Sequence, residues 1–483
     1  MILRIIGNDF HYECENLCRI FYPNEKISVV YDYEGSDPLT VIAGYENGAV
    51  YADVDINGKK AFSKTDTEDE RAELDLAVQI YKCLVEITGY TPPWGVLTGV
   101  RPSKLFIRLT EDMGFENAVN YFKNELLVNE NKTGLTVAVA GYEKEIMDSF
   151  MPDGFSLYVS IPFCPSRCSY CSFVSHSIAN ANARRILPEY LEKLADEIKA
   201  ISGYASSLNL KLENIYFGGG TPGVLEASQL DYLQCVIEDN FSLDYLKEYT
   251  VEIGRPDTVT PEKLRVLKLH NTDRISINPQ TFNQKTLDAI GRKHTVEQAV
   301  EAYRLSRSYG FKCINTDFIA GLPGETPDDF RNSLDTAVML APENITVHTL
   351  SLKRSSYLNT QGAEVDRGAA AGEMLDYARE LLTASGYDPY YMYRQSKCAG
   401  NLENVGWSRG ETAGRYNVCM MEERQTVFAA GAGAVTKLCA QNGRKVERIF
   451  NYKYPFEYIS GFDEIAARKN RIYDFYSEVN ERK

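Results

Sequence analysis

The amino-acid sequence predicts an α/β protein built around a partial (β/α)6 barrel of the TIM type. Six apolar, β-branched or aromatic runs recur between residues 156 and 352, and helical patterns fill the intervals between them. Strands and helices that alternate at this spacing indicate parallel βα units with right-handed crossovers. Because six units are too few to close the eight-stranded ring, we expect an open or partial barrel.

Local patterns justify each element of this barrel in turn. The six runs predict strands at residues 156–163, 213–217, 249–253, 273–278, 313–319 and 345–352. Helices are expected at residues 188–201, 226–239, 260–270, 295–309 and 326–340. Pro188 suits the first turn of the first helix, and the start signal Thr326-Pro327-Asp328-Asp329 precedes the last.

Three regions follow from where this alternation starts and stops. Residues 1–150 precede it and predict an N-terminal α/β domain of unknown role, with strands near 2–6 and 27–56 and a helix near 67–88. The turn-forming stretch around Met151-Pro152-Asp153-Gly154 marks a boundary, so the barrel is assigned to residues 151–385. Residues 386–483 form a C-terminal region that is expected to be mixed and mainly helical.

Composition and charge exclude several classes of protein. The chain has 52 basic and 67 acidic side chains, a formal net charge of −15. This balance argues against a general binder of nucleic acid or of anionic membranes. The start of the chain lacks a sustained apolar run, and no stretch approaches the length of a membrane span. We therefore expect a cytoplasmic protein without a membrane span or a nucleic-acid partner.

Polar and glycine-rich residues follow the ends of the predicted strands. Cys164 follows the first strand, Gly218-Gly219-Gly220-Thr221 follows the second, and Glu252 closes the third. Asn278-Pro279-Gln280 ends the fourth strand and Asp317 lies in the fifth. In parallel α/β folds the chemistry sits at the carboxyl ends of the strands. The sequence therefore predicts one site at this face of the barrel.

Three of the eleven cysteines form a tight group, Cys164-Pro-Ser-Arg-Cys168-Ser-Tyr-Cys171. Thiolates at this spacing can bind three irons of one cuboidal cluster, and the fourth iron keeps the open position that chemistry at a metal centre requires. Tyr170 and Phe173 are expected to shield such a cluster from solvent. From spacing alone, a zinc site completed by His176 remains an alternative.

This motif, which follows the strand Tyr158-Val-Ser-Ile-Pro-Phe163, resembles that of the radical S-adenosylmethionine (SAM) superfamily. Within the superfamily, the sequence is most similar to the oxygen-independent coproporphyrinogen III oxidase-like group, and there to the coproporphyrinogen dehydrogenase HemZ branch. The resemblance covers the barrel and the C-terminal region, and the stretch Leu97-Thr-Gly-Val-Arg101-Pro also fits the branch. It implies a 4Fe-4S cluster on Cys164, Cys168 and Cys171, with S-adenosyl-L-methionine as the second cofactor.

The resemblance also implies a SAM pocket. Gly219, Gly220 and Thr221 match a turn whose backbone contacts the methionine amino group, since glycine lets backbone groups approach a ligand closely. Arg292 matches a basic residue near the SAM carboxylate, whose geometry suits a guanidinium. The other implied contacts are Tyr158, Tyr170 near the adenine, Glu252, Gln280 and Asp317. No residue is assigned a catalytic role.

The reaction implied by the resemblance is the oxygen-independent oxidative decarboxylation of coproporphyrinogen III to protoporphyrinogen IX, a step of haem (porphyrin) biosynthesis. In such an enzyme the reduced cluster donates one electron to SAM, and the resulting radical abstracts hydrogen from the substrate. The expected partners are a small tetrapyrrole and an unidentified low-potential electron donor. Six cations are candidates for contacts with its propionates: Arg101, Lys104, Arg292, Lys293, Lys353 and Arg354.

Two positions depart from the patterns of this group. Ser172 stands where the oxidases carry a further Cys just after the cluster ligands. Gly400 stands where the related haem-chaperone branch carries a His, and glycine cannot serve as an axial haem ligand. Two alternatives therefore stay open: a radical SAM enzyme that acts on another tetrapyrrole, and a haem-binding or haem-delivery protein without decarboxylase activity.

Overall fold

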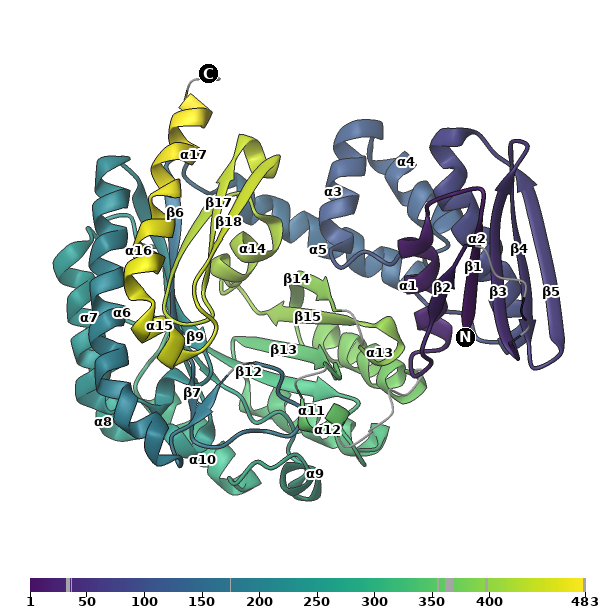
Figure 1. Cartoon of the computed structure of the whole chain (residues 1–483). Coiled ribbons are helices and arrows are strands. Elements are labelled where there is room, and N and C mark those ends of the chain that lie inside the picture. The colour runs from purple at the N-terminus through teal and green to yellow at the C-terminus, as the bar shows by residue number, and fades with distance from the viewer. Residues whose placement is uncertain are drawn as a thin grey trace.

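The computed structural model describes residues 1–31, 35, 37–173, 175–353, 356–360, 368–395 and 398–480 of the chain. Its strands form a five-stranded sheet, an eleven-stranded sheet and a two-stranded ribbon. Figure 1 shows the five-stranded sheet at one end of the molecule and the large sheet, with its helices, at the other. Among the described residues, no helix is long and apolar enough to cross a membrane.

The five-stranded sheet has the order β2-β1-β3-β4-β5 and is built from the start of the chain. Its strands are β1 (Ile2–Ile6), β2 (Ser28–Val30), β3 (Leu39–Glu46), β4 (Ala49–Ile56) and β5 (Lys59–Asp66). Tight Asn-Gly turns connect β3 to β4 and β4 to β5, at Asn47-Gly48 and Asn57-Gly58, and all four residues have positive φ. This turn chemistry matches the twist of an antiparallel hairpin and so fixes the register.

Helices join this sheet to the rest of the chain. Helices α1 (His11–Phe21) and α2 (Ala72–Thr88) pack against each other, and α2 packs on β4 and β5. Helices α3 (Pro102–Met113), α4 (Phe115–Asn120) and α5 (Glu130–Asp148) follow. Helix α5 packs on strand β14 and helix α14 of the C-terminal region, so the N-terminal region reaches the large sheet directly.

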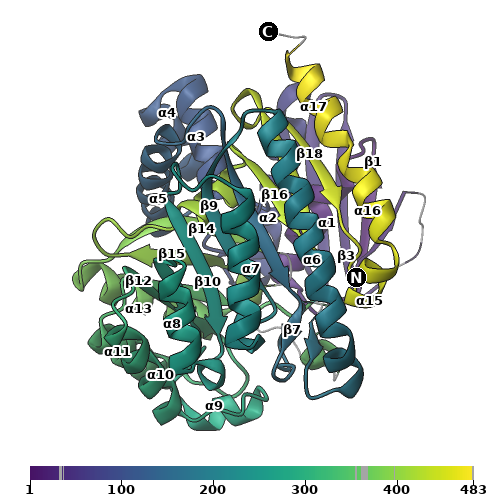
Figure 2. The ribbon, with the colours of Figure 1, turned by 90° about the vertical axis from the view of Figure 1, so that its left-hand side faces the viewer.

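Six neighbouring parallel strands form the middle of the large sheet, as the sequence predicts. They are β6 (Gly154–Ile161), β9 (Lys211–Gly219), β10 (Glu248–Gly254), β11 (Arg274–Ile277), β12 (Cys313–Ala320) and β13 (Asn344–Thr349). The intervening helices are α6 (Ala181–Ser207), α7 (Ala227–Asn240), α8 (Pro261–Leu269), α9 (Gln284–Ala289), α10 (Val296–Ser308) and α11 (Pro327–Leu340). Figure 2 shows α6, α7 and α8 lying side by side over the outer face of β9 and β10.

Helix α6 begins earlier than the sequence predicts. The Asn180 side chain accepts a hydrogen bond from the backbone N–H of Asn182 and thereby caps the helix at Ala181. Pro188 consequently lies inside the helix rather than in its first turn. The start of α11 does follow its sequence signal, because Thr326 forms a capping box, and Thr295 forms another before α10.

The C-terminal region extends the large sheet at both of its edges, giving the order β14-β15-β13-β12-β11-β10-β9-β6-β16-β17-β18. The added strands are β14 (Asp388–Arg394), β15 (Glu403–Ser408), β16 (Thr426–Ala430), β17 (Val435–Ala440) and β18 (Lys445–Phe450). The helices near or within this region are α12 (Tyr357–Thr360), α13 (Ala369–Ala384), α14 (Arg415–Glu422), α15 (Pro455–Ser460), α16 (Phe462–Lys469) and α17 (Arg471–Asn480). The region expected to be mainly helical thus also supplies five strands to the sheet.

Candidate active site

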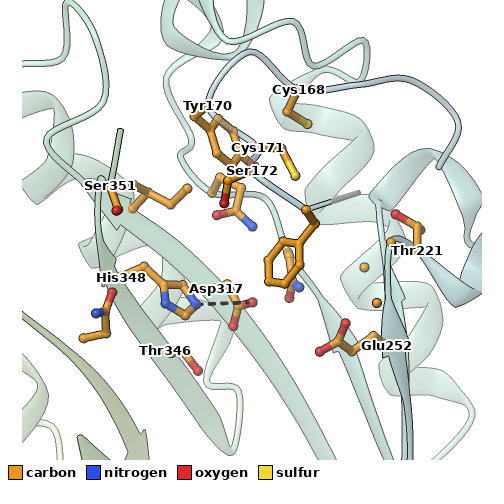
Figure 3. Close-up of a pocket in the computed structure, with 18 of the residues that line it drawn as sticks. Cys168, Tyr170, Cys171, Ser172, Thr221, Glu252, Asp317, Thr346, His348 and Ser351 are labelled. Carbon is orange, nitrogen blue, oxygen red and sulfur yellow. Dashed lines mark ion pairs between the residues drawn. The ribbon is translucent and has the colours of Figure 1, made fainter. Parts of the chain in front are cut away.

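One cavity of about 600 Å³ lies at the carboxyl ends of the parallel strands. All twelve residues that the sequence singles out for a cluster or a SAM pocket line it: Tyr158, Cys164, Cys168, Tyr170, Cys171, Gly219, Gly220, Thr221, Glu252, Gln280, Arg292 and Asp317. Figure 3 shows the cysteine loop on one side of this cavity and the side chains of Glu252 and Asp317 on the opposite side. The fold therefore gathers into one place residues that are far apart in the sequence.

The three cysteines lie on a single loop that backbone hydrogen bonds hold in place. Cys164 ends the short strand β7 (Phe163–Cys164), which pairs in parallel with β8 (His176–Ser177). The loop is tied to the neighbouring chain by a hydrogen bond from the Ser169 N–H to the Ile290 carbonyl, with an N–O distance of 3.0 Å. Cys168 is buried, whereas Cys164 and Cys171 are half-buried at the cavity wall.

The structure does not gather these thiols and His176 around a point that one zinc ion could occupy. Ligand atoms of a tetrahedral zinc lie about 4 Å apart. Among the described residues, the one group of three such atoms within 4.8 Å is Asp231 and Cys235 on the outer helix α7 and His270 just after α8. The His176 ring instead lies edge-on to the rings of two aromatic residues of the C-terminal region. The zinc alternative therefore finds no support in the geometry.

The glycine-rich turn after β9 lies directly beneath the cysteine loop. Gly219 has a φ of +106°, a conformation that side-chain-bearing residues rarely adopt. A Cβ atom on Gly220 would lie 2.6 Å from the Phe163 carbonyl oxygen and 3.0 Å from the Cys164 sulfur. The hydroxyl of Thr221 donates a hydrogen bond to that sulfur at 3.5 Å. The turn and the loop therefore fit together only with glycine at position 220.

Two carboxylates form the opposite wall. Glu252 accepts a short hydrogen bond from the hydroxyl of Tyr216. Burial raises the pKa of Glu252 to about 7, although this hydrogen bond opposes the shift. Asp317 accepts a hydrogen bond of 2.7 Å from the Asn315 amide and lies 3.7 Å from the Nε2 atom of His348 (Figure 3). Both acids are thus held in fixed orientations that face the cavity.

Gln280 and Arg292 connect the fourth strand to the cysteine loop. Gln280 has a φ of +73°, a strained conformation for a residue with a side chain, and backbone hydrogen bonds to Asp317 and Ile319 maintain it. The Arg292 guanidinium donates hydrogen bonds to the Tyr170 hydroxyl at 3.0 Å and to the Asn278 carbonyl at 2.6 Å. Its Nε atom is buried without a partner in the described structure. The arginine therefore keeps one donor uncommitted.

Four tyrosines that the sequence did not assign to the site, Tyr216, Tyr391, Tyr393 and Tyr416, form another wall of the cavity together with Tyr158. The rings of Tyr158, Tyr216 and Tyr416 stack with centroid distances of 4.3 to 6.3 Å. Tyr391 and Tyr393, on β14, stack at 6.2 Å and also line the cavity. For the three in the C-terminal region the available signal was weak, because it consisted only of the many tyrosines there, whereas Tyr216 lies in a predicted strand just before the glycine-rich turn.

Arg255 and His348 are two further cavity residues that sequence reasoning missed. Arg255 follows strand β10, is 3% exposed and donates a hydrogen bond to the Cys168 sulfur at 3.5 Å. His348 lies near the end of β13, with 27% of its side chain exposed. A signal was available for both, since each follows or ends a strand at the same face as the predicted residues.

The cations expected to meet a substrate are distributed differently from the prediction. Arg101 and Lys104 pair with Glu423 at N–O distances of 2.7 and 3.2 Å. Lys293 and Lys353 are not among the described residues that line the cavity, and Arg354 lies outside the described residues. Within the described lining, the arginines are Arg255 and Arg292, and both adjoin the cysteine loop.

The structure also shows where Phe173 lies and where the two residues that depart from the family patterns, Ser172 and Gly400, lie. Phe173 is 68% exposed and lines the cavity close to the cysteine loop, so its shielding of a cluster stays a prediction. Ser172 lines the cavity next to Cys171 (Figure 3). Gly400 has a φ of +59°, and a Cβ atom on the adjacent Gly368 would lie 2.4 Å from the Gly400 Cα atom. Gly400 is thus part of a close backbone contact and offers no ligand.

Comparisons with known proteins agree with this arrangement. The sequence model of the Radical SAM superfamily matches residues 158–337. Over 479 residues the chain is 36% identical to the oxygen-independent coproporphyrinogen-III oxidase-like protein HemZ of Bacillus subtilis, covering 95% of this chain and 94% of that protein. It is 28% identical to the heme chaperone HemW of Haemophilus influenzae, covering 66% of this chain and 81% of that protein.

Among solved structures, coproporphyrinogen III oxidase (HemN) from Escherichia coli, a radical SAM enzyme, matches with a TM-score of 0.52 and 21% identity. The match covers 68% of this chain and 73% of that chain, and at this identity it concerns the fold. The near full-length similarity to HemZ goes further. The chain belongs to the radical SAM superfamily, in the HemZ-like group of oxygen-independent coproporphyrinogen III oxidase-like proteins.

Proposed function

We propose that this protein is a radical SAM oxidoreductase that converts coproporphyrinogen III to protoporphyrinogen IX without oxygen. The observation that carries the proposal is the single cavity in which the three-cysteine loop faces the polar ends of the parallel strands. The name of the HemZ relative, similar over nearly the whole chain, supports the choice of substrate. In each of two rounds, a propionate side chain would lose one hydrogen atom to the radical derived from SAM, one CO2, and one electron to an unidentified one-electron acceptor, and a vinyl group would remain.

The residues of the loop fit a 4Fe-4S cluster. Cys164, Cys168 and Cys171 provide three thiols on one loop at one cavity wall, which leaves one iron without a protein ligand. Gly220 leaves the space beside the Cys164 sulfur that a side chain would fill. When bound and reduced, such a cluster supplies the electron that cleaves SAM and generates a hydrogen-abstracting radical.

The surrounding residues fit SAM. The backbone at Gly219, Gly220 and Thr221 suits the amino group of its methionine, and the free donor of Arg292 suits the carboxylate. Tyr158, Tyr170, Glu252, Gln280 and Asp317 would provide the remaining contacts. Tyr216 and Asn315 would hold the two acids in position.

The tyrosine wall favours a tetrapyrrole as the substrate. Tyr158, Tyr216, Tyr391, Tyr393 and Tyr416 line the cavity, and aromatic side chains pack well against pyrrole rings. A haem-binding role has less support, because the position that carries a His in haem chaperones is here the tightly packed Gly400.

The test is an anaerobic assay with protein reconstituted with iron and sulfide and supplied with dithionite, SAM and coproporphyrinogen III. Mass spectrometry follows 5′-deoxyadenosine and the porphyrin products. The Cys168→Ala variant removes a proposed cluster ligand, and Cys235→Ala, a half-buried cysteine on the outer helix α7, is the matched control. We expect deoxyadenosine and the loss of two CO2 from the wild type and from Cys235→Ala, and neither product from Cys168→Ala.

Other results would redirect the assignment. Cysteine-dependent deoxyadenosine with an unchanged porphyrin would keep the radical chemistry but exclude this substrate in favour of another tetrapyrrole. Fully loaded protein that forms no deoxyadenosine would contradict the enzymatic proposal. A haem titration would then decide whether the chain retains haem in a one-to-one complex.

A further inference from the structure

Arg255 is a buried cation in direct contact with one of the proposed cluster ligands. It is 3% exposed and follows strand β10, where the backbone leaves the sheet into a short 3-10 turn, Pro256–Thr258. Its Nη1 atom donates a hydrogen bond to the Cys168 sulfur, with an N–S distance of 3.5 Å. The contact joins the end of the third parallel strand to the middle of the cysteine loop.

The position of the Arg255 guanidinium is fixed from its other side. Asp257 accepts hydrogen bonds from Nε at 3.0 Å and from Nη2 at 3.4 Å. This bidentate pairing uses the fork geometry of the guanidinium and leaves Nη1 directed at the sulfur. The Asp257 side chain is 27% exposed, so solvent screens its negative charge more than it screens the buried arginine.

Another cysteine of the loop has a donor of a different kind. Cys164 receives its hydrogen bond from the neutral hydroxyl of Thr221, also at 3.5 Å. Hydrogen bonds to the sulfurs, net charge and solvent exposure set the reduction potential of iron–sulfur clusters. Reduction adds one negative charge, and a buried positive charge beside the sulfur stabilises that charge more than a neutral hydroxyl does.

We propose that Arg255 is a positioning residue that raises the reduction potential of the cluster by donating a charged hydrogen bond to the Cys168 sulfur. The inference rests on the proposed function insofar as it requires a cluster on this loop. It assigns Arg255 to the electron-accepting step, whereas Arg292, the other arginine of the cavity lining, is directed at Tyr170 and the SAM pocket.

The experiment is a potentiometric titration of the reconstituted protein without SAM, in which electron paramagnetic resonance measures the reduced cluster. The Arg255→Met variant keeps a long side chain but loses the charge and the donors. We expect its reduction equilibrium to be at least about tenfold less favourable, which is a decrease of 59 mV for a one-electron couple. Thr221→Val, which removes the neutral donor to Cys164, should give a smaller decrease.

A conservative variant keeps the test decisive if Arg255→Met does not bind a cluster. Arg255→Lys retains the charge but loses the fork that Asp257 and Cys168 share, so its potential should lie between those of the wild type and the Met variant. Loaded variants with the wild-type potential would overturn the inference and leave the proposed function intact. A wild-type protein that binds no iron and sulfide would instead contradict the proposed function itself.

Discussion

Segments far apart in the sequence meet both at the cavity and at the junction between the N-terminal region and the large sheet. The two places differ in how their charged side chains are paired. At the cavity, Arg292 keeps a buried donor without a partner in the described structure, and Glu252 is held by a neutral hydroxyl rather than by a cation. At the junction between the N-terminal region and the large sheet, ions of opposite sign pair with one another. One Arg292 donor in the cavity thus remains available to a ligand, whereas the Arg101 and Lys132 charges at the junction are paired with carboxylates.

The junction is formed by residues 94–104 packing on the C-terminal strands and on α14. Glu423 pairs with Arg101 and Lys104 of this stretch and with Lys437 and Arg448 of the sheet edge. Burial alone would raise the pKa of Glu423, but its hydrogen bond to Arg101 and the nearby cations hold that pKa well below its usual range. The Arg101 and Lys104 charges are therefore committed to a structural contact.

A second contact of the junction is more deeply buried. Glu403 of β15 accepts hydrogen bonds from Trp94 Nε1 at 2.8 Å and from Lys132 Nζ at 2.6 Å. Arg394 of β14 donates to the Leu97 carbonyl at 2.7 Å. Because β14 and α14 carry three of the cavity tyrosines, we infer that residues 1–150 support one wall of the cavity. The difference teaches that a buried cation with an uncommitted donor, such as Arg292, is the stronger candidate for ligand binding.

The largest effect on the reaction rate is expected for a substitution at Gly220 in the cavity wall. In Gly220→Ala the new Cβ atom would lie 2.6 Å from the Phe163 carbonyl oxygen, so the turn and the cysteine loop must separate. Displacement of a reacting group by about 1 Å costs on the order of 10²-fold in rate, and deoxyadenosine formation should fall by that factor. Gly203→Ala is the control, because Gly203 lies in α6 with nothing within 4 Å of its added Cβ. Wild-type rates from Gly220→Ala would contradict the tight fit.

The largest effect on stability is expected at the buried part of the junction. The Lys132–Glu403 pair has side-chain exposures of only 7% and 2%, and Glu403→Ala leaves Lys132 with the half-exposed Asp376 at 3.5 Å and the Trp94 N–H without its acceptor. Breaking a buried pair in this way costs about 3–5 kcal/mol of unfolding free energy, which the midpoint of urea denaturation would report. Glu373→Ala breaks the exposed Arg331–Glu373 pair and should cost less than about 1 kcal/mol. Equal losses of unfolding free energy in the two variants would contradict the expected difference between the buried and the exposed ion pair.

A smaller effect concerns the pH dependence of stability at Glu252. Burial raises its pKa in the folded state to about 7, above the value of about 4.3 expected for the unfolded chain. The folded state therefore binds more protons, and its stability should fall as the pH rises from about 4.3 to 7. Glu252→Gln should remove this part of the dependence, on the order of 2 kcal/mol, in urea titrations at pH 5 and pH 8. An unchanged pH dependence would mean that Glu252 is ionised throughout.

The smallest effect is expected for Arg101→Ala at the exposed side of the junction. Glu423 would keep Lys104, Lys437 and Arg448, and the Arg101 side chain is 25% exposed, so the loss of stability should be at most about 1 kcal/mol. The KM for coproporphyrinogen III should not change, because Arg101 faces Glu423 rather than the cavity. A raised KM with an unchanged midpoint of urea denaturation would instead support the sequence-based prediction that Arg101 contacts the substrate.

The sequence by itself determined the features that depend on neighbouring residues. The spacing of Cys164, Cys168 and Cys171 lies within one loop, and the strand and helix periods of residues 154–349 are local patterns. Turn and capping chemistry, as at Thr326, acts over a few residues and can be read directly. Where a competing local signal existed, as at Asn180, the helix start was misplaced.

The tertiary structure alone decided which distant side chains meet. Arg255 and Cys168 are 87 residues apart in the sequence, and Arg101 and Glu423 are 322 residues apart. A helical or strand pattern spans only a few residues, so it could predict neither contact. The same holds for the five C-terminal strands that complete both edges of the sheet. An arginine carries the same charge wherever it lies in a sequence. Only its neighbours in the folded structure decide whether that charge contacts a sulfur, binds a ligand or pairs with a carboxylate of another region.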